Sequence, residues 1–532
     1  MKDAPKIHLI LLLILIALGL FRFFLVLQAD RVPPIHDPLH LRHLSRLLYE
    51  GLRENHEAMA LFCHQPSPAD YPPLIHFTAQ PFLFLLGPEK GAESSMALYL
   101  VILLLSIYGI TRRLAGPPAG LLAVGLALLT PHLDAFSRVY MVDYLLSAMT
   151  ALTFYLLITS EGFSRRLRVI ILGVCCFMGM LAKESFVLYA AIPILCSAAY
   201  HLLHAKPPER ARLLWNLALF ILAAGIPLFI YYRPRLAFLI QSRLLIQAFA
   251  TGVQPHPYQL LRYPTMLMQS SIGPVIGAGA LVGLIYLMRK RAFGSILAWA
   301  VLPLFLIDAV HNIESPRYLL PVLPAFVMLC AVGVESLAGA FEHRAVLVRV
   351  FVLVVAAVTF VFNLFAVPNQ PFTFRSFHDR FQDEGMPRAQ SVAWRVDGPA
   401  KLIMLKGPQA NVALLLNSPY SEVLQGALWD AKPLWMVDSV FEGASVGFTP
   451  EEFKTPAGAA QFFSRYTWLL LHSKHDRDQR FVNYTHPVDP AFVANVFEAF
   501  SAVQNQFTLI GRYPYPEGGG EVWLYERVKP PA

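Results

Sequence analysis

Apolar segments of about 17–23 residues recur from position 7 to position 367, and they limit the fold more than any other feature. Each is long enough to cross a hydrocarbon core of about 30 Å as an α-helix. Over all 532 residues, 56% are hydrophobic and 15% are charged, whereas soluble domains average about 45–50% and about 25%. The sequence therefore predicts a polytopic α-helical membrane protein.

The composition becomes typical of a soluble domain after Pro368. The apolar runs at 401–407, 467–473, 507–513 and 521–528 predict strands, with Gly518-Gly519-Gly520 as a hairpin turn. The runs at 411–417 and 490–503 suit helices. We therefore expect a transmembrane domain at 1–367, with a first extracytoplasmic loop at 28–93, and an extracytoplasmic α/β domain at 368–532.

The charges between the apolar segments predict about eleven transmembrane helices. Arginine and lysine clusters occur in every second loop, as expected for cytoplasmic loops, and place the N-terminus in the cytoplasm. The first segment is too long for an ordinary signal peptide and is expected to remain uncleaved. The expected spans are 7–27, 95–111, 117–133, 143–160, 169–182, 185–203, 213–232, 271–288, 294–310, 318–339 and 350–367.

The net charge of +8 does not indicate a nucleic-acid partner, because the basic residues lie in the short loops that set membrane orientation. Four of the five cysteines fall in apolar segments and suit small buried side chains. Cys63 alone lies in the first loop. Neither a disulfide framework nor a paired-cysteine zinc site is indicated.

The first loop contains Asp37 shortly after a membrane exit. An acid there can act as a general base toward an acceptor hydroxyl or help to hold a metal. The alternative is that Asp37 caps a short interfacial helix, because Pro38 and the following LHLRHLSRLLYEG have helical features. His36, His40 and His43 share one face of that helix; a zinc site is the less favoured interpretation and interfacial histidines the favoured one.

Further charged residues lie near the outer ends of the expected spans. Arg138 and Asp143 flank the corner between two spans, Lys183 and Glu184 follow a third, and Arg317 precedes a fourth. Ionisable groups at membrane depth usually face a cavity and mark a substrate path. Two alternatives remain: an Arg138–Asp143 ion pair that holds the corner, and interfacial side chains that extend to water.

Five sequence features occur in a fixed order over roughly residues 1–340: Asp37, Pro72-Pro73-Leu74, TPHLDAFSRVYMVD (130–143), GMLAKE (179–184) and RYLLPVLP (317–324). With these features the chain resembles the GT-C glycosyltransferases that use polyprenyl-phosphate sugars. The nearest branch is the group of protein O-mannosyltransferases and lipid A aminoarabinose transferases.

The resemblance implies transfer of a sugar from a polyprenyl-phosphate donor to a lipid, glycan or protein acceptor on the extracytoplasmic face, with inversion. Asp37 and Asp143 would be the catalytic residues: Asp37 would deprotonate or orient the acceptor, and Asp143 would orient acceptor or sugar hydroxyls. Members often have two adjacent acids where this chain has Asp37-Pro38, and some have a lysine where it has Tyr71. The donor phosphate would therefore fall to the cations Arg138, Lys183 and Arg317.

The predicted substrate cavity includes His36, Tyr71, Pro72 and Glu184. No metal ligand set is assigned, although some relatives of this kind bind a divalent metal. The expected location is a bacterial inner or plasma membrane. Two other functions stay open: a transporter or flippase of lipid-linked sugars, and a scaffold of the same fold that lacks catalysis.

Overall fold

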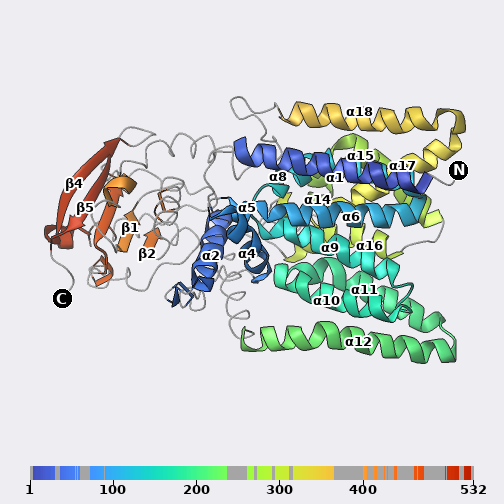
Figure 1. Ribbon diagram of the computed structural model, residues 1–532, viewed down its shortest axis with the longest axis horizontal. Helices are drawn as coiled ribbons and strands as arrows, with labels where there is room; N and C mark the ends of the chain where they lie inside the picture. Colours follow the sequence, from blue (N-terminus) through green and yellow to red (C-terminus); the bar gives the residue numbers. More distant parts are fainter. Residues whose placement is uncertain are drawn as a thin grey trace. The chain divides into compact units, whose positions relative to one another are not determined.

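The computed structural model (Figure 1) divides the chain into two compact units. The first unit comprises Met1–Ala29 and Pro66–Phe377, and the second comprises Asp30–Gln65 and His378–Ala532. The expected domain division at 367 stays a prediction. The structure describes residues 4–29, 36–53, 72–88, 90–235, 261–268, 272–289, 294–310, 316–364, 399–403, 411–415, 436–439, 461–463, 465–472, 501–514, 521–528 and a few single residues between these ranges.

The regular secondary structure of the first unit is helical in the residues that the structure describes. Its helices are α1 (Ala4–Ala29), α4 (Leu74–Leu86), α5 (Gly91–Ser94), α6 (Met96–Ala115), α7 (Pro117–Leu128), α8 (Pro131–Ser137), α9 (Val142–Thr159), α10 (Arg166–Ala182), α11 (Phe186–His204), α12 (Pro207–Tyr232), α14 (Arg262–Met266), α15 (Gly273–Arg289), α16 (Gly294–Val310), α17 (Leu323–Ala340) and α18 (Ala345–Leu364). Short 3-10 turns lie at Arg233–Arg235, Pro316–Leu319 and Glu342–Arg344.

Six of the described helices are long and apolar enough to cross a membrane, which confirms the predicted polytopic class. A seventh crossing is added if α7 and α8, which meet at a 67° bend, form one broken span. Four apolar stretches are shorter, and they lie in α4, α15, α16 and α18 at Leu74–Leu86, Val275–Arg289, Gly294–Ile307 and Ala345–Val361. The predicted spans coincide with helices, and their total of eleven stays a prediction.

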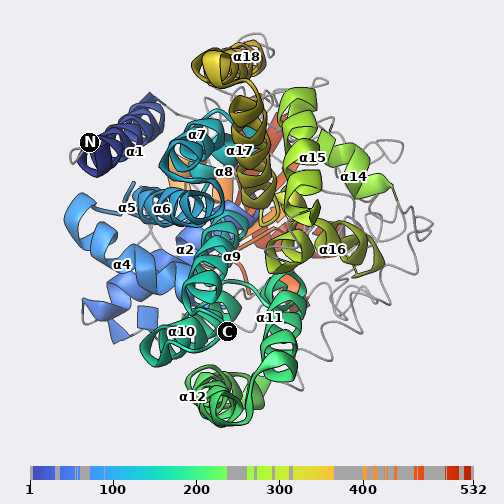
Figure 2. The same ribbon diagram turned by 90° about the vertical axis from the view of Figure 1, so that its right-hand side faces the viewer.

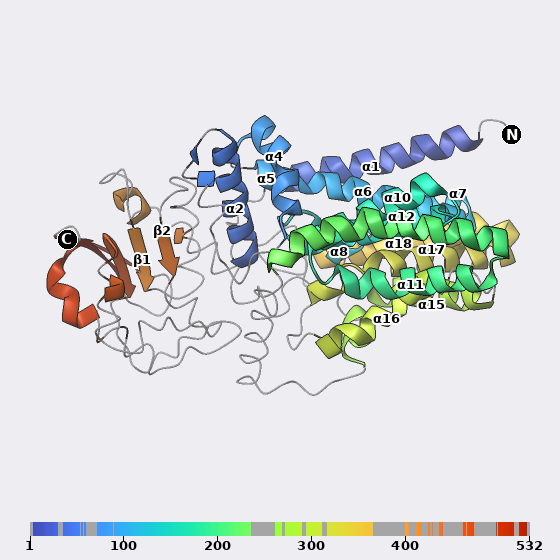
Figure 3. The ribbon, with the colours of Figure 1, turned by 90° about the horizontal axis from the view of Figure 1, so that it is seen from below.

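The long helices of the first unit run side by side (Figure 3). Viewed from one end, α9 lies among α6, α10, α11 and α17, whereas α12 and α18 lie at the periphery (Figure 2). Burial follows this arrangement, since 83% of α9 is buried, whereas only 17% of the most apolar 18-residue stretch of α12 is buried. Large apolar side chains on α12 are exposed, as lipid-facing helices require.

Glycines allow α15 and α17 to pack backbone against backbone. A Cβ atom added at Gly283 would collide with the carbonyl oxygen of Leu329, and one added at Gly333 would collide with the carbonyl oxygen of Gly279. Small residues at such crossings let transmembrane helices approach closely and gain van der Waals contact. This contact holds the middle of α17 against α15.

The second unit contains α2 (His36–Leu52) and a five-stranded mixed sheet. Its strands are β1 (Asn411–Leu415), β2 (Met436–Ser439), β3 (Trp468–His472), β4 (Phe507–Pro514) and β5 (Glu521–Arg527), in the order β2-β1-β3-β5-β4. The pairs β1–β2 and β1–β3 are parallel, and β3–β5 and β4–β5 are antiparallel. The α/β character predicted for this region is confirmed.

Two local predictions in this unit were wrong. Residues 411–415 form an interior strand rather than a helix, and residues 401–403 are helical rather than extended. The reason is that β1 is paired on both sides and four of its five residues are buried, so its apolar run lacks the alternation of a half-exposed strand. The predicted strands at 467–473, 507–513 and 521–528 match β3, β4 and β5.

Candidate active site

An ion pair joins the beginning of α9 to the end of α10. Lys183 Nζ donates to Asp143 Oδ1 at 2.7 Å, and the two side chains are 10% and 1% exposed. Asp143 lies in the first turn of α9 and Lys183 directly follows α10. The helix dipoles favour an acid at the first position and a cation at the second, so the local structure supports both charges.

Only one oxygen of the Asp143 carboxylate is used by this pair. Within the described part of the chain, Asp143 Oδ2 is buried without a hydrogen-bond partner. A buried carboxylate oxygen is costly to leave unsatisfied, and such exceptions often mark a position that a ligand completes. Asp143 can therefore accept a hydrogen bond from a hydroxyl group while it remains paired with Lys183.

Two cations lie near the ring of Tyr318. Lys183 Nζ is 5.5 Å from the ring centroid, and the guanidinium carbon of the neighbouring Arg317 is 5.4 Å from it. Both distances lie within the range of cation–π attraction. The Tyr318 ring thereby holds the predicted phosphate ligands Lys183 and Arg317 at one place in the fold.

Side chains from three helices fix the backbone that carries Arg317. Tyr189 Oη donates to the carbonyl oxygen of Tyr318 at 2.8 Å, and Ser147 Oγ to that of Leu320 at 2.9 Å. Trp299 Nε1 donates to the carbonyl oxygen of Pro321 at 2.8 Å. The 3-10 turn Pro316–Leu319 and the prolines after it interrupt the helical hydrogen bonds, so neighbouring helices satisfy these carbonyls instead.

Arg138 belongs to a different cluster. Its Nη2 donates to Asp134 Oδ2 at 2.9 Å, and Arg22 Nη2 from α1 donates to the same oxygen at 2.8 Å. The alternative of an Arg138–Asp143 pair is wrong, because each residue has another partner. The reason is that α8 places Asp134 one helical turn before Arg138, whereas Asp143 faces the end of α10.

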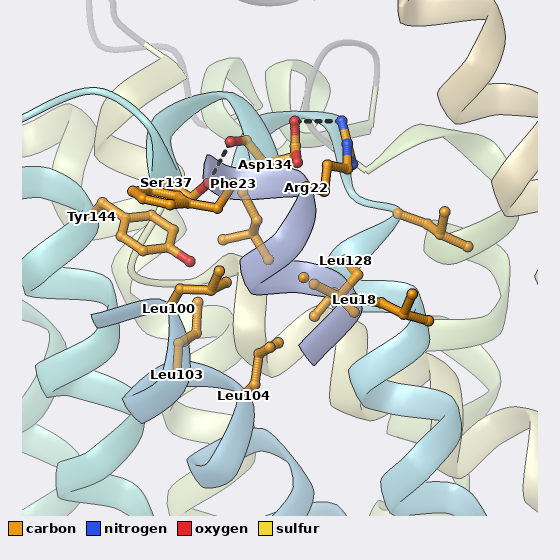
Figure 4. A pocket seen from close by; sticks show the side chains of 14 residues that line it. Leu18, Arg22, Phe23, Leu100, Leu103, Leu104, Leu128, Asp134, Ser137 and Tyr144 are labelled. Carbon is orange, nitrogen blue, oxygen red and sulfur yellow. Dashed lines mark hydrogen bonds and ion pairs between the residues drawn. The ribbon is translucent and has the colours of Figure 1, made fainter. Parts of the chain in front are cut away.

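A cavity of about 160 Å³ lies beside this second cluster (Figure 4). Leucines make up half of its lining residues, and Arg22, Asp134, Ser137 and Tyr144 supply its polar groups. Tyr144 follows Asp143 on α9, and successive helical residues point about 100° apart. The two side chains therefore point to different sides of α9. Asp143 contacts Lys183, and Tyr144 lines the cavity.

The other predicted cavity residues are described only in part. Glu184 is half-buried next to Lys183, and Pro72 is buried just before α4. Tyr71 and the side chains of His36 and Asp37 lie outside the described residues. The proposed convergence of Asp37 with Asp143 is therefore untested and stays a prediction.

Helix α2 includes the expected helical run after Asp37 and begins at His36. His40 is exposed while His43 is buried, and burial lowers the pKa of His43 to about 3, with His40 adding to the effect. A neutral imidazole at neutral pH is the form that binds metals. The residues that the structure describes include no group of three or more His, Cys, Asp or Glu placed to hold a metal.

Several residues of the site were not predicted from the sequence. Arg22 lies inside the first apolar span, and a lone arginine there is costly enough to have indicated a functional position. Tyr189, Ser147 and Trp299 gave no such signal, because hydroxyl and indole groups are ordinary in apolar helices. Their roles depend on carbonyl groups that only the folded chain brings within reach.

Comparison with known proteins agrees with this architecture. Residues 70–231 match the family model for dolichyl-phosphate-mannose-protein mannosyltransferase. The fold is similar to that of ArnT from Cupriavidus metallidurans in the apo state, with a TM-score of 0.59 at 14% identity over 96% of this chain and 97% of that one. Among curated protein sequences no match was found.

Two further solved structures share the fold. ArnT from the same organism bound to undecaprenyl phosphate matches with a TM-score of 0.59 at 13% identity, over 96% of this chain and 97% of that one. The archaeal oligosaccharyltransferase AglB from Archaeoglobus fulgidus, in complex with an inhibitory peptide and a dolichol-phosphate, matches with a TM-score of 0.50 at 11% identity. That match covers 89% of this chain and 70% of AglB.

The fold defines a multi-pass integral membrane protein of the GT-C type. The resemblance inferred from the ordered motifs is confirmed, since the matched family segment contains three of them and the fold matches over nearly the whole chain. This chain is thus similar to GT-C glycosyltransferases of the mannosyltransferase and aminoarabinose transferase group.

Proposed function

We propose that the protein transfers a sugar from a polyprenyl-phosphate donor to a lipid, glycan or protein acceptor on the extracytoplasmic face of a bacterial plasma membrane. The observation that carries the proposal is the arrangement of Arg317 and Lys183 around Tyr318, next to the buried acid Asp143. Lipid-linked phosphates in the ArnT and AglB structures support the same class of donor.

The phosphate requires cations because its charge increases as the sugar leaves. In the proposed reaction the acceptor oxygen forms a bond to the anomeric carbon while the bond to the phosphate oxygen breaks, with inversion. Arg317 stabilises the departing lipid phosphate, and its planar guanidinium can donate two parallel hydrogen bonds. Lys183 assists as a point charge that is already balanced in part by Asp143.

Asp37 is the proposed base, which takes the proton from the acceptor hydroxyl. Asp143 has a different proposed role, because its pairing with Lys183 leaves Oδ2 to accept a hydrogen bond from a sugar hydroxyl. Arg138 stays a predicted phosphate ligand, although Asp134 balances part of its charge. Transfer before and after dialysis against EDTA tests whether a divalent metal also takes part.

The decisive experiment supplies the purified protein with a labelled polyprenyl-phosphate sugar and with membrane lipid and protein acceptors. We expect transfer by the wild type, a loss of about 10²-fold for Arg317→Gln and a loss of about 10²–10⁴-fold for Asp37→Asn. Arg349→Gln is the control, because Arg349 pairs with Glu335 on α17 and is 28% exposed.

The two alternative functions give different results in the same assay. A transporter would move the labelled donor across sealed vesicles without transferring the sugar, and a scaffold would do neither. Full transfer by Arg317→Gln would contradict the proposed phosphate site. Full transfer by Asp37→Asn would contradict the assignment of the base while leaving the phosphate site intact.

A further inference from the structure

The cavity beside Arg22 has the features of a lipid site. Half of its lining residues are leucines, and Leu18 on α1 is 57% exposed. Arg22 and Asp134 lie together at one end of the lining, while Leu104 and Leu128 lie farther into it (Figure 4). An apolar cavity with a charged group at one end suits a hydrocarbon chain that carries an ionic head.

The side chain of Arg22 can extend to the depth of a lipid head group. It precedes the end of the α1 span, at Gln28, by six residues, which corresponds to about 9 Å along a helix. Long arginine side chains at such positions extend toward the interface. The head group would therefore lie at the membrane surface while the chain descends along α1.

The charge at this end of the cavity favours an anion. Arg22 and Arg138 donate to the same oxygen of one carboxylate, Asp134 Oδ2. A guanidinium has five N–H donors, and Arg22 is 28% exposed beside the cavity. Among the described residues Arg22 donates one hydrogen bond, to Asp134, so its other N–H groups can donate to an anionic phosphate at the mouth of the cavity.

We propose that this cavity binds one acyl chain of an anionic glycerophospholipid whose phosphate contacts Arg22. The cavity is separate from Lys183 and Arg317 of the proposed donor site, because Asp143 and Tyr144 point to different sides of α9, whereas Arg138 lies beside the cavity. The bound lipid would join α1 to α6, α7 and α8. Arg22 also stacks on Phe360 of α18 at 4.1 Å, so the lipid would steady the contact between the first and last of these helices.

Photocrosslinking in lipid nanodiscs tests the proposal. The probe is phosphatidylglycerol with a diazirine on one acyl chain, and phosphatidylcholine with the same chain is the neutral comparison. Peptide mapping should find label on α1, α6 and α7 with the anionic probe. Phosphatidylcholine should give about five-fold less label, because its choline cation cancels the charge of its phosphate and the attraction of one arginine to a net anionic lipid contributes about that factor.

Three variants distinguish the effect of the Arg22 charge from the effect of the cavity volume. Arg22→Gln should lose label about five-fold, and Arg22→Lys, which retains the charge, should keep most of it. Ala127→Leu should also lose the label, because Ala127 is buried in the cavity wall and the larger side chain fills the space. Arg349→Gln, with the same exposure and an acidic partner on α17, should label like the wild type.

Equal labelling by the two probes, or wild-type labelling of Arg22→Gln, would overturn the proposal. Displacement of the glycerophospholipid by an equimolar polyprenyl phosphate would also overturn it, since the cavity would then belong to the donor. Crosslinking is measured without an acceptor, so sugar transfer can fail while the label remains. The two proposals are thereby tested independently.

Discussion

Lys183 Nζ and Asp143 Oδ1 form a buried hydrogen-bonded ion pair at 2.7 Å between the end of α10 and the beginning of α9. Removing charges from water costs several kcal/mol for each ion, and their mutual attraction returns much of that cost only while both are present. The pair therefore has a structural effect as well as its proposed role near the donor phosphate.

Loss of Lys183 alone should destabilise the protein strongly. Lys183→Met leaves the Asp143 carboxylate buried without its counter-charge, and the expected cost is about 3–5 kcal/mol in free energy of unfolding. Thermal unfolding in detergent measures the effect. The double variant Lys183→Met with Asp143→Leu should recover most of the loss, because no buried charge then remains.

An exposed ion pair is the control for this prediction. Arg165 and Glu161 form a pair at 2.9 Å, with side chains 60% and 46% exposed. Arg165→Met should leave the unfolding temperature nearly unchanged, because water screens the lost charge. A similar effect of Lys183→Met and Arg165→Met would show that the buried pair contributes little.

Tyr189→Phe should weaken donor binding indirectly, through the turn that carries Arg317. The variant removes the hydroxyl that donates to the Tyr318 carbonyl oxygen, which holds the turn that carries Arg317. We expect a KM for the donor raised about three- to ten-fold and a stability loss of about 1–3 kcal/mol. Steady-state kinetics with the labelled donor provide the measurement.

Two comparisons isolate the positioning effect. In the Arg317→Gln background, Tyr189→Phe should leave the KM unchanged, because the group that it positions is already absent. Thr111→Val removes a buried hydroxyl that donates to Ile107 within α6, and should alter stability but not KM. Independent, multiplicative effects of Tyr189→Phe and Arg317→Gln on KM would refute the positioning role.

Gly283→Ala should disrupt the packing of α15 against α17. The new Cβ would collide with the carbonyl oxygen of Leu329, which is backbone and cannot rotate away. Overpacking of this kind costs about 1–3 kcal/mol, or more where only backbone can move. Gly339→Ala, on α17 with open space around its Cβ position, should be neutral or slightly stabilising. Equal melting temperatures for the two variants would contradict the close approach.

The stability of the second unit should fall at acid pH because of His43. Burial lowers its folded pKa to about 3, so between pH 3 and about 6.5 the unfolded chain binds a proton that the folded chain does not. Stability from this residue therefore rises with pH across that window and is constant above it, with a difference of about 2–3 kcal/mol between pH 4.5 and 7.5.

His43→Leu should remove most of this pH dependence, as measured by thermal unfolding at pH 4.5 and 7.5. The exposed His343 offers a matched control, and His343→Leu should retain the wild-type difference. If His43→Leu and the wild type lose the same stability at pH 4.5, then the buried histidine is not the source of the acid sensitivity.

Much of the fold was predictable, because whether a segment enters the membrane depends on its own length and apolar composition. The apolar runs matched helices, and the motif order indicated the GT-C type that the fold match confirms. Strand β1 was mistaken for a helix, because a strand buried on both faces has no alternating pattern. The bend between α7 and α8 divided one predicted span at a proline, Pro131.

The sequence by itself determined which segments enter the lipid and which residues carry charge, because the cost of placing a polar group in hydrocarbon depends on residue type and segment length. Only the tertiary structure decided the partners. Asp143 pairs with Lys183 forty positions away, and Arg138 shares Asp134 with Arg22 of α1. Ion pairing depends on distances of a few ångströms between helices, and these distances follow from packing across the whole unit.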